Sequence, residues 1–415
     1  MIASSSRRRF LIGSSAATIA ALGCGPQKGT TAPTTSEPTK PAPLPEIAEP
    51  NKGSGKFRLL VLGGTGFIGP HIVDAALAKG WEVTLFNRGK TRPELFPDVE
   101  KLQGDRDGKL DALKGRDWDA VIDNSGYVPR IVKDSATLLA DHVKQYVFVS
   151  SISAYDESIY GKKGITETDK VATMPDPTVE RVMEFYGALK ALCEQAAEAA
   201  MPGRVTNVRP GYIVGPGDPT DRFTYWPLRV EKGGEFVAPG TPDGPMQYID
   251  ARDLAAWMIN AVEQKHVGVY NLCGPVEPTN IGALLQTCIE VTGNKEAKPV
   301  WIDAKFLEEH EVQIGGDLPI WLPDDEKFAG FARVSNAKAV ATGLVTRPTA
   351  DTVRDLLKWF HEQPEPRQKA VRAGWLPQKE AEVLAAFHSG GKGKKKGKAK
   401  PKKTAMLAAS LFGYA

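Results

Sequence analysis

The middle of the chain alternates short apolar runs with longer amphipathic segments. Runs of strand length, such as "FRLLVL" from Phe57 and "QYVFVSS" from Gln145, are separated by segments whose apolar residues recur at helical spacing. Further runs of the same kind are "EVTLFNRG", "KLQGD", "DAVIDNSGY" and "RVTNVRPG". Strand-like runs that alternate with helical segments are typical of a parallel sheet with helices on both faces. We therefore expect an α/β fold with a doubly wound parallel sheet.

The N-terminal 24 residues have a different pattern. "SRRRFLIG" from Ser6 resembles the twin-arginine export signal, and a weakly apolar segment of Ala, Ile and Gly follows it, too short to span a bilayer. We predict that residues 1–24 are this signal, and that the protein is exported to the periplasm or attached to the cell envelope. "ALGC" resembles the box before a lipidated cysteine but has Ala21 in place of the usual Leu, so a lipid tether on Cys24 stays open.

Two further segments cannot form a core. Residues 25–55 are rich in Pro, Thr, Ser and Gly and are expected to be a disordered linker. Residues 389–415 carry eight lysines between Lys392 and Lys403 and are expected to be a disordered tail, either solvated or in contact with an anionic surface. These eight lysines carry more positive charge than the formal net charge of the whole chain, +3, so the rest of the chain is net negative. That balance argues against a basic nucleic-acid binder.

The cysteines favour neither a disulfide framework nor a metal site. Apart from Cys24, the chain has Cys193, Cys273 and Cys288, an odd number without the spacing of metal ligands.

The first apolar run leads into a glycine-rich turn, "GGTGFIG", and then a helical segment. Glycines at 63, 64, 66 and 69 satisfy the G-x-G-x-x-G spacing, which lets the backbone approach a pyrophosphate at a helix N-terminus. A merely structural glycine turn is the weaker alternative. The predicted cofactor residues here are Gly63, Thr65, Gly66, Phe67, Ile68 and Gly69.

The second apolar run ends where dinucleotide-binding sites recognise the adenosine ribose. An acidic residue there accepts a hydrogen bond from the 2′-hydroxyl, whereas an arginine accommodates a 2′-phosphate. This chain has Asn87 and Arg88, with Lys90 and Arg92 following. We therefore favour NADP over NAD, although these residues could also be ordinary solvated loop residues.

A candidate catalytic group follows the fifth apolar run. "FVSSISAY" places Ser151 at the carboxyl end of a strand, and "YGALK" places Tyr186 and Lys190 four residues apart on one helical face. The ammonium would lower the pKa of the phenol from about 10, which would make Tyr186 a usable acid and base, while Ser151 holds the same substrate oxygen. Tyr-x-x-x-Lys alone is common, but after a glycine fingerprint and a strand-end serine it indicates a catalytic triad.

Together these motifs resemble the extended short-chain dehydrogenase/reductase family, in its sugar epimerase/dehydratase branch. The resemblance runs from about Phe57 to Phe360 and also rests on "GDRD", "RPGYIVGPGD" and "QYIDARDLA". It implies an NAD(P)-binding Rossmann domain, which we place at residues 56–275, and a smaller, mostly C-terminal substrate-binding part at residues 276–388. It also implies that Ser151, Tyr186 and Lys190 are the triad, and that Asp105, Arg106, Ser125, Tyr186 and Lys190 contact the cofactor.

The chain departs from the family pattern at two places. The usual acid after the second strand is missing, which puts NAD in doubt, and "DNSGYV" replaces a common Ala-rich turn, which could alter the nicotinamide pocket. For the substrate, Arg222, Trp226 and Arg229 could grip a phosphate or sugar, but packing or solvated roles are at least as well supported.

Three functions remain open at this stage. The first is an exported NADP-dependent epimerase, dehydratase or reductase that acts on a sugar-like alcohol, with a tightly held cofactor and no metal. The second is a non-catalytic binding protein, as are the chloroplast stem-loop RNA-binding relatives of this branch. The third is an envelope-tethered structural protein with a vestigial cofactor. Tyr186, Lys190 and the net negative body favour the first, which expects a small-molecule partner and no nucleic acid.

Overall fold

The computed structural model describes residues 55–390, which lie within one compact unit. The predicted export signal, Cys24, nearly all of the linker and the lysine-rich part of the tail lie outside the described residues.

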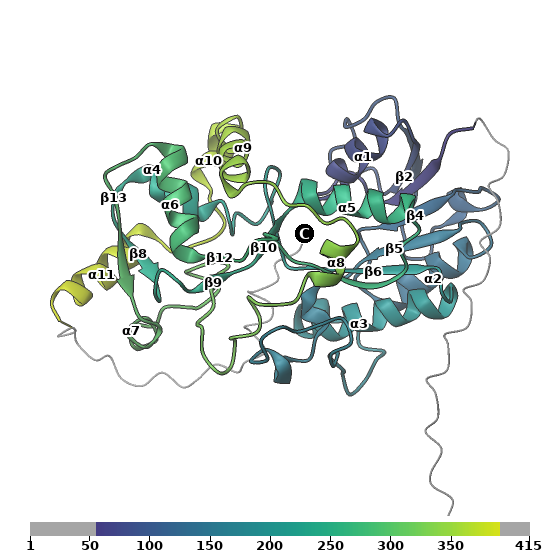
Figure 1. Cartoon of the computed structure of the whole chain (residues 1–415). Coiled ribbons are helices and arrows are strands. Elements are labelled where there is room, and N and C mark those ends of the chain that lie inside the picture. The colour runs from purple at the N-terminus through teal and green to yellow at the C-terminus, as the bar shows by residue number, and fades with distance from the viewer. Residues whose placement is uncertain (1–54, 391–415) are drawn as a thin grey trace, which may run out of the picture. The chain divides into compact units, whose positions relative to one another are not determined.

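A seven-stranded parallel sheet forms the centre of the larger part (Figure 1), in the order β11-β6-β5-β4-β1-β2-β3. Its strands are β1 (Arg58–Leu62), β2 (Glu82–Asn87), β3 (Glu100–Gln103), β4 (Ala120–Asp123), β5 (Gln145–Val149), β6 (Val205–Pro210) and β11 (Gly268–Leu272). Six of them coincide with the six apolar runs of the sequence. In this order β1 lies between β2 and β4, so the direction of strand succession reverses beside β1. Such a switch point is where doubly wound sheets bind ligands.

Both faces of the sheet are apolar, and each is covered by a pair of helices. Leu59 and Val61 pack on one face with α1 (Gly69–Ala78) and α5 (Ala251–Glu263). Leu60 and Leu62 point the other way, toward α2 (Pro129–Leu139) and α3 (Val182–Ala200). Because successive side chains of a strand face opposite sides, a continuously apolar strand needs cover on both. The predicted doubly wound α/β fold is confirmed.

Another core cluster, here called the second core cluster, lies beside the sheet and includes Trp226, Phe236 and Leu356. Two short strand pairs frame it: β8 (Gly234–Pro239) with β13 (Ala297–Ile302), which is parallel, and β9 (Pro245–Met246) with β12 (Thr279–Asn280), which is antiparallel. The helices that contribute to it are α4 (Tyr225–Lys232), α6 (Ile281–Thr292), α7 (Ala304–Glu309), α9 (Thr349–His361) and α11 (Pro377–His388). The short helix α10 (Glu365–Lys369) contributes no buried residue. The remaining short elements are η1 (Asp111–Leu113), η2 (Ile152–Ala154), η3 (Glu157–Ile159) and α8 (Ala337–Ala341).

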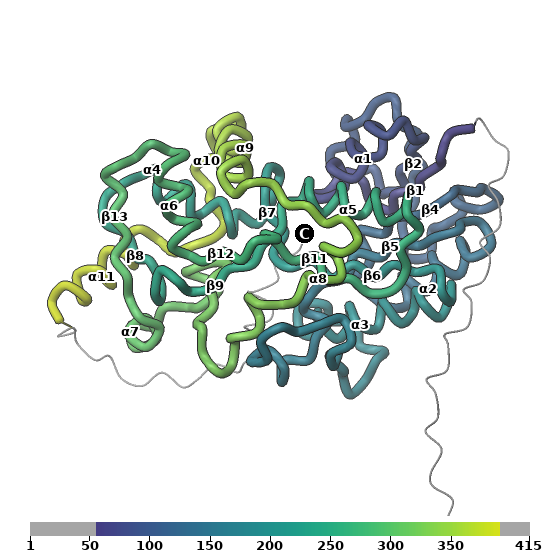
Figure 2. Tube along the Cα trace, viewed as in Figure 1, coloured from purple at the N-terminus to yellow at the C-terminus, as the bar shows by residue number. Residues whose placement is uncertain are grey.

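The two parts interleave along the chain (Figure 2). Residues of α4 and β8 belong to the second core cluster, whereas Ala339 of α8 belongs to the cluster around α1 and α5, and α8 packs on β11. The parallel pair of β7 (Tyr212–Val214) and β10 (Tyr248–Asp250) joins the two parts. Tyr212 and Val214 belong to the second core cluster, whereas Ile213 between them belongs to the cluster around α1 and α5. A single boundary at residue 275, as placed from the sequence, therefore does not separate the two parts.

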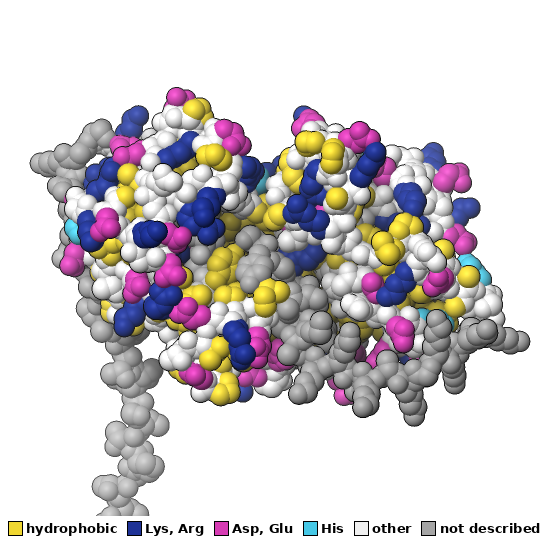
Figure 3. Space-filling view, turned by 180° about the vertical axis from the view of Figure 1, so that it is seen from behind, with side chains coloured by type: hydrophobic (Ala, Val, Ile, Leu, Met, Phe, Trp, Pro, Cys, Tyr) yellow, Lys and Arg dark blue, Asp and Glu magenta, His cyan; other side chains and the backbone are white. Residues whose placement is uncertain are grey.

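The surface carries charges of both signs. On the face in Figure 3, basic and acidic side chains are interspersed rather than gathered by sign. None of the helices within residues 55–390 is long and apolar enough to cross a lipid bilayer.

Candidate active site

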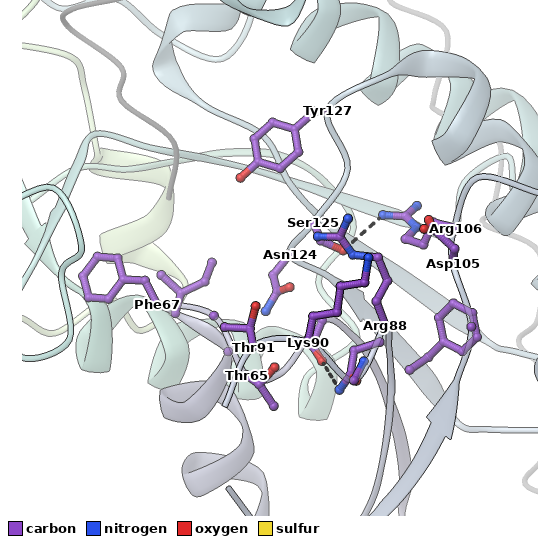
Figure 4. A pocket seen from close by; sticks show the side chains of 18 of the residues that line it. Thr65, Phe67, Arg88, Lys90, Thr91, Asp105, Arg106, Asn124, Ser125 and Tyr127 are labelled. Carbon is purple, nitrogen blue, oxygen red and sulfur yellow. Dashed lines mark hydrogen bonds between the residues drawn. The ribbon is translucent and has the colours of Figure 1, made fainter. Parts of the chain in front are cut away.

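A cavity of about 400 Å³ lies at the carboxyl ends of β1, β2 and β4, beside the switch point (Figure 4). Many of its lining residues were predicted from the sequence to contact a cofactor: Gly63, Thr65, Gly66, Phe67, Ile68, Gly69, Asn87, Arg88, Asp105, Arg106 and Ser125. Asn124, Tyr127 and Ile131 complete the wall after β4. The turn that contains Asn124 and Tyr127 was noted in the sequence, but neither was named as a site residue, and Ile131 was not identified.

The glycine turn forms one wall of this cavity. Gly63 has φ +117°, and a Cβ there would lie 2.0 Å from Oδ1 of Asn124, so neither the backbone nor the space tolerates a side chain. Helix α1 begins next to this turn without a side-chain cap and without an acidic residue in its first turn. Because the first amides of a helix lack intrahelical partners and carry a partial positive charge, this wall suits a phosphate group.

Arg92 supports the turn instead of lining the cavity. Its Nε donates to the carbonyl oxygen of Thr65 across 3.0 Å, and its guanidinium also bonds to the carbonyl oxygen of Gly66. Arg92 thereby braces the loop from outside.

The residues after β2 differ in how they are held. Nδ2 of Asn87 donates to the carbonyl oxygen of Gly63 across 3.4 Å, and its Oδ1 accepts from the Gly89 amide across 2.9 Å, so Asn87 is tied to its own loop and the glycine turn. Arg88 and Lys90 are exposed, and Figure 4 shows both side chains extending along the same side of the cavity. Within the described part of the chain, Asp105 is the one carboxylate that lines this cavity.

Arg106 lies under the cavity in a buried network. It pairs with Asp123, donates to Oγ of Ser135 across 2.6 Å, and lies 3.5 Å from Oγ of Ser125, the hydrogen bond drawn in Figure 4. Ser125 in turn donates to the carbonyl oxygen of Leu62 across 3.1 Å. Arg106 thus fixes the loop after β4, and one edge of the Arg106 side chain faces the cavity.

A second, smaller cavity of about 50 Å³ brings the three predicted catalytic residues together. Ser151, Tyr186 and Lys190 all line it, with Ser150, Gly211 and Ile213. Ile68, Asn124 and Tyr127 line both cavities, so the two adjoin. A dinucleotide with its phosphates at the glycine turn would extend from the first cavity toward the second.

Lys190 is buried near Tyr186. Its Nζ donates to the carbonyl oxygens of Gly126 and Val149 across 2.7 and 2.8 Å, and lies 5.9 Å from the centre of the Tyr186 ring. Burial lowers the pKa of Lys190 to about 8. Helix α3 packs closely on the segment that follows β5: a Cβ on Gly187 would lie 2.1 Å from the carbonyl oxygen of Ser153, so this close approach requires glycine.

Two adjacent serines follow β5. Oγ of Ser151 lies 2.8 Å from Oγ of Ser153 and accepts from the Ser153 amide across 3.1 Å, so Ser151 caps η2. Ser150 is also buried, and among residues 55–390 its hydroxyl has no hydrogen-bond partner. A buried hydroxyl of this kind is expected to find a partner, which a ligand could supply. The Ser-Ser pair in the sequence was the available signal for Ser150.

Of the predicted substrate residues, Trp226 and Arg229 are corrected by the structure. Trp226 is fully buried in the second core cluster, where its indole donates to the carbonyl oxygen of Pro319 across 3.0 Å. Arg229 pairs with Glu380 at 2.7 Å and donates to the carbonyl oxygens of Gly233 and Glu235, so its guanidinium joins α4 to α11 and β8. Both side chains serve packing because α4 turns this face inward.

Arg222 has a different environment. It is half-buried, its Nε donates to Oγ1 of Thr220 across 3.1 Å, and its guanidinium lies 5.3 Å from the ring centre of Tyr212. It lines neither of the two cavities.

The described residues hold no group of three or more His, Cys, Asp or Glu side chains that could ligate a metal ion. Cys193, Cys273 and Cys288 are buried and unpaired by disulfides.

Sequence comparison finds one matching family model and several relatives. The model of the "NAD dependent epimerase/dehydratase family" matches residues 59–273. A chloroplast stem-loop binding protein of 41 kDa from Arabidopsis thaliana is 25% identical over 321 residues, which cover 73% of this chain and 78% of that protein. The epimerase family protein SDR39U1 of Bos taurus is 28% identical over 242 residues, 54% of this chain and 76% of the relative.

Solved structures share the fold at lower identity. A UDP-N-acetylglucosamine 4-epimerase from Methanobrevibacter ruminantium, in complex with UDP-N-acetylmuramic acid, superposes with a TM-score of 0.56 at 18% identity, covering 74% of this chain and 99% of that one. Human SDR39U1 with NADPH superposes with a TM-score of 0.50 at 21% identity, covering 73% of this chain and 99% of that one. MoeE5 with UDP-glucose and NAD superposes with a TM-score of 0.51 at 18% identity, covering 73% of this chain and 98% of that one.

Proposed function

Since the chain belongs to the NAD dependent epimerase/dehydratase family, we propose that it is an enzyme that binds a nicotinamide dinucleotide and acts on a hydroxyl group of a sugar-like substrate. The observation that carries this proposal is the shared wall of the two cavities. Ile68, Asn124 and Tyr127 line both, which supports a single site formed by the glycine turn and the Ser151, Tyr186 and Lys190 group.

The residues of the first cavity fit the cofactor. The glycine turn leaves room for a pyrophosphate, the uncapped start of α1 offers amides to it, and Asp105 and Ser125 lie farther along the wall. When bound, a nicotinamide dinucleotide accepts a hydride from the carbon that bears a hydroxyl group and can return it.

The residues of the second cavity would handle the proton. Tyr186, as phenolate, would take the proton of the substrate hydroxyl when the bound cofactor oxidises the carbon that bears it to a carbonyl. Lys190 lies on the same helix face, and its positive charge favours the phenolate form. The Ser151 hydroxyl donates to the substrate oxygen, which requires it to turn from Ser153.

For the cofactor we propose NADP in preference to NAD. Arg88 and Lys90 line the cavity, and the loop after β2 contributes no carboxylate to its wall. Asn87 occupies the place of the acid that would bind a ribose hydroxyl. Neighbours of both kinds are known, since human SDR39U1 was solved with NADPH and MoeE5 with NAD.

For the reaction we propose a redox-neutral cycle such as epimerisation, in which the hydride returns to the same or a second substrate. Two structural neighbours are epimerases that were solved with UDP-sugars. If residues 1–24 direct export in a folded state, nucleotide sugars would be scarce at the destination, and a free or polymer-linked sugar is the better substrate. The cofactor would then travel inside the folded protein and stay bound through many turnovers.

RNA binding is the second candidate, because the stem-loop binding protein aligns over most of this chain. The interspersed charges of Figure 3 and the assembled Ser151, Tyr186 and Lys190 group favour catalysis. A mobility-shift titration with structured RNA separates the two: a salt-sensitive complex that survives Tyr186→Phe would favour RNA binding.

The decisive experiment is to purify the full chain, extract its bound small molecules, and assay it on free and polymer-linked sugars. We expect a near-stoichiometric nicotinamide dinucleotide and activity that persists after dialysis. A protein that purifies empty and works only with added NADP would contradict the retained cofactor. A protein that neither contains nor binds a nicotinamide dinucleotide would contradict the proposed function.

A further inference from the structure

The loop after β4 contacts Lys190 from two sides. The carbonyl oxygen of Gly126 accepts from Nζ across 2.7 Å, and the ring centre of the next residue, Tyr127, lies 4.6 Å from the same atom. The Phe148 ring lies 5.0 Å away. An ammonium attracts the face of an aromatic ring, most strongly where water is excluded.

Lys190 has no carboxylate partner among the described residues. The charged groups around it are Asp123 on β4, Arg106 after β3 and Glu194 on α3. Asp123 is paired with Arg106, and Glu194 is paired with Arg209 at 2.6 Å, so each carboxylate is compensated by its own arginine.

The Cys193 thiol, a further titratable neighbour of Lys190, does not supply a negative charge at neutral pH either. Burial raises the pKa of the Cys193 thiol to about 12, which keeps the thiol neutral. The other close groups are the aromatic rings of Tyr127, Phe148 and Tyr186. The buried ammonium therefore depends on two carbonyl dipoles and on aromatic rings.

Tyr127 also occupies a boundary. It lines both cavities, its ring centre lies 6.5 Å from that of Tyr186, and in Figure 4 its ring projects over the cavity with the hydroxyl on the side of Phe67. Of the rings around Nζ, it is the nearest, and it stands in the "DNSGY" turn where the chain departs from the Ala-rich sequence of the family it resembles.

We propose that Tyr127 is a positioning residue that keeps the buried Lys190 ammonium protonated beside Tyr186. This inference rests on the proposed function for its catalytic consequence, but the contact itself can be tested without turnover. Tyr127 acts through Lys190: without its ring the ammonium would be held by the two carbonyl oxygens and the more distant rings alone.

The test is a titration of Lys190 in the full chain without substrate. Lysine labelled with ¹³C at Cε gives a resonance for each side chain, and Lys190→Met identifies the one of interest. We expect Tyr127→Leu to lower the pKa of Lys190 by roughly one unit, the size of a desolvated cation–π contact. Tyr127→Phe is the matched control, because it keeps the ring, and should leave the titration within about 0.3 unit of the unsubstituted protein.

A variant with 4-cyanophenylalanine at position 127 keeps the shape of the ring but withdraws electron density from its face. It should lower the pKa of Lys190 even if Tyr127→Leu does not fold. An unchanged titration in the 4-cyanophenylalanine variant, or in a folded Tyr127→Leu, would overturn the inference.

The catalytic consequence is a shift of the pH profile. Because the ammonium would be lost at lower pH, the alkaline decline of kcat should move down by the same unit in Tyr127→Leu and stay in place in Tyr127→Phe. If no variant, including the unsubstituted protein, turns over any sugar, the proposed function fails while the titration still decides the role of Tyr127.

Discussion

Nζ of Lys190 lies 2.7 Å from the carbonyl oxygen of Gly126, so the helix that carries Tyr186 is bonded directly to the loop that follows β4. The same loop forms a wall of the first cavity through Asn124 and Ser125. The contact therefore links the proposed proton-transfer group to the proposed cofactor site.

Tyr186→Phe should separate binding from chemistry. The substitution keeps the ring but removes the proton-transferring hydroxyl, so turnover should fall by roughly 100-fold or more. Fluorescence titration should show cofactor affinity within about twofold of the unsubstituted protein. Turnover that is not reduced would leave Tyr186 as an ordinary helix residue.

Lys190 should make stability depend on pH. Its folded pKa, about 8, lies below the ordinary 10.5 because of burial. Between these values the unfolded chain binds a proton that the folded one does not, so the free energy of unfolding should rise with pH, by about 1.4 kcal/mol per unit. The difference between the unsubstituted protein and Lys190→Met, from denaturant unfolding at pH 7.5 to 10.5, measures this. A difference that is flat with pH would mean that Lys190 titrates normally.

Arg88→Ala should distinguish the two cofactors. If Arg88 contacts a 2′-phosphate, its loss should weaken NADP binding by roughly 1.5–3 kcal/mol and NAD binding much less. Arg92→Ala is the matched control. Because Arg92 braces the turn through the Thr65 and Gly66 carbonyls, it should weaken both cofactors alike. Calorimetric affinities that fall equally for NADP and NAD in Arg88→Ala would contradict the preference for NADP.

Ser150→Ala should weaken ligand binding without reducing stability. The hydroxyl is buried and has no partner within residues 55–390, so its removal should leave thermal stability unchanged or raised. If a ligand supplies the partner, affinity for cofactor or substrate should fall by about tenfold. Ser153→Ala offers a comparison, because its hydroxyl already pairs with Ser151. Unchanged affinities and kinetics in Ser150→Ala would exclude a ligand contact.

Arg229→Met should destabilise the protein without changing the site. It leaves Glu380 without its partner in a largely buried position, a loss that typically costs about 3–5 kcal/mol. Adding Glu380→Gln should restore part of that stability, since no carboxylate then remains uncompensated. Cofactor affinity should be unchanged in both variants; a selective loss of substrate binding with normal stability would return Arg229 to the substrate site.

The sequence was sufficient for features set by local periodicity. The apolar runs predicted β1 to β6, the glycine spacing predicted the turn after β1, and the four-residue spacing of Tyr186 and Lys190 placed both on one helix face. These patterns depend on residues close in the chain. The six runs alone did not order the strands; that order follows the connection rules of parallel sheets.

Features set by distant contacts were not accessible in this way. Trp226 is an indole in a plausible binding segment, and only the position of Pro319, far along the chain, shows that it is a core residue. Between Lys338 and Phe360 the structure has two helices, α8 and α9, which pack on different clusters. Gly343, with φ +96°, and Pro348 lie in the break.

The β7 and β10 pair contributes side chains both to the second core cluster and to the cluster around α1 and α5, because successive side chains alternate in direction. A chimera that takes the substrate-side part from a relative cannot therefore be made with one crossover near residue 275. Such a graft would also have to carry α4 and β8, and to return α8 to the sheet of the host. Changes of substrate preference in this fold are accordingly easier to obtain by altering loops while keeping the β7 and β10 pair than by exchanging the whole substrate-side part.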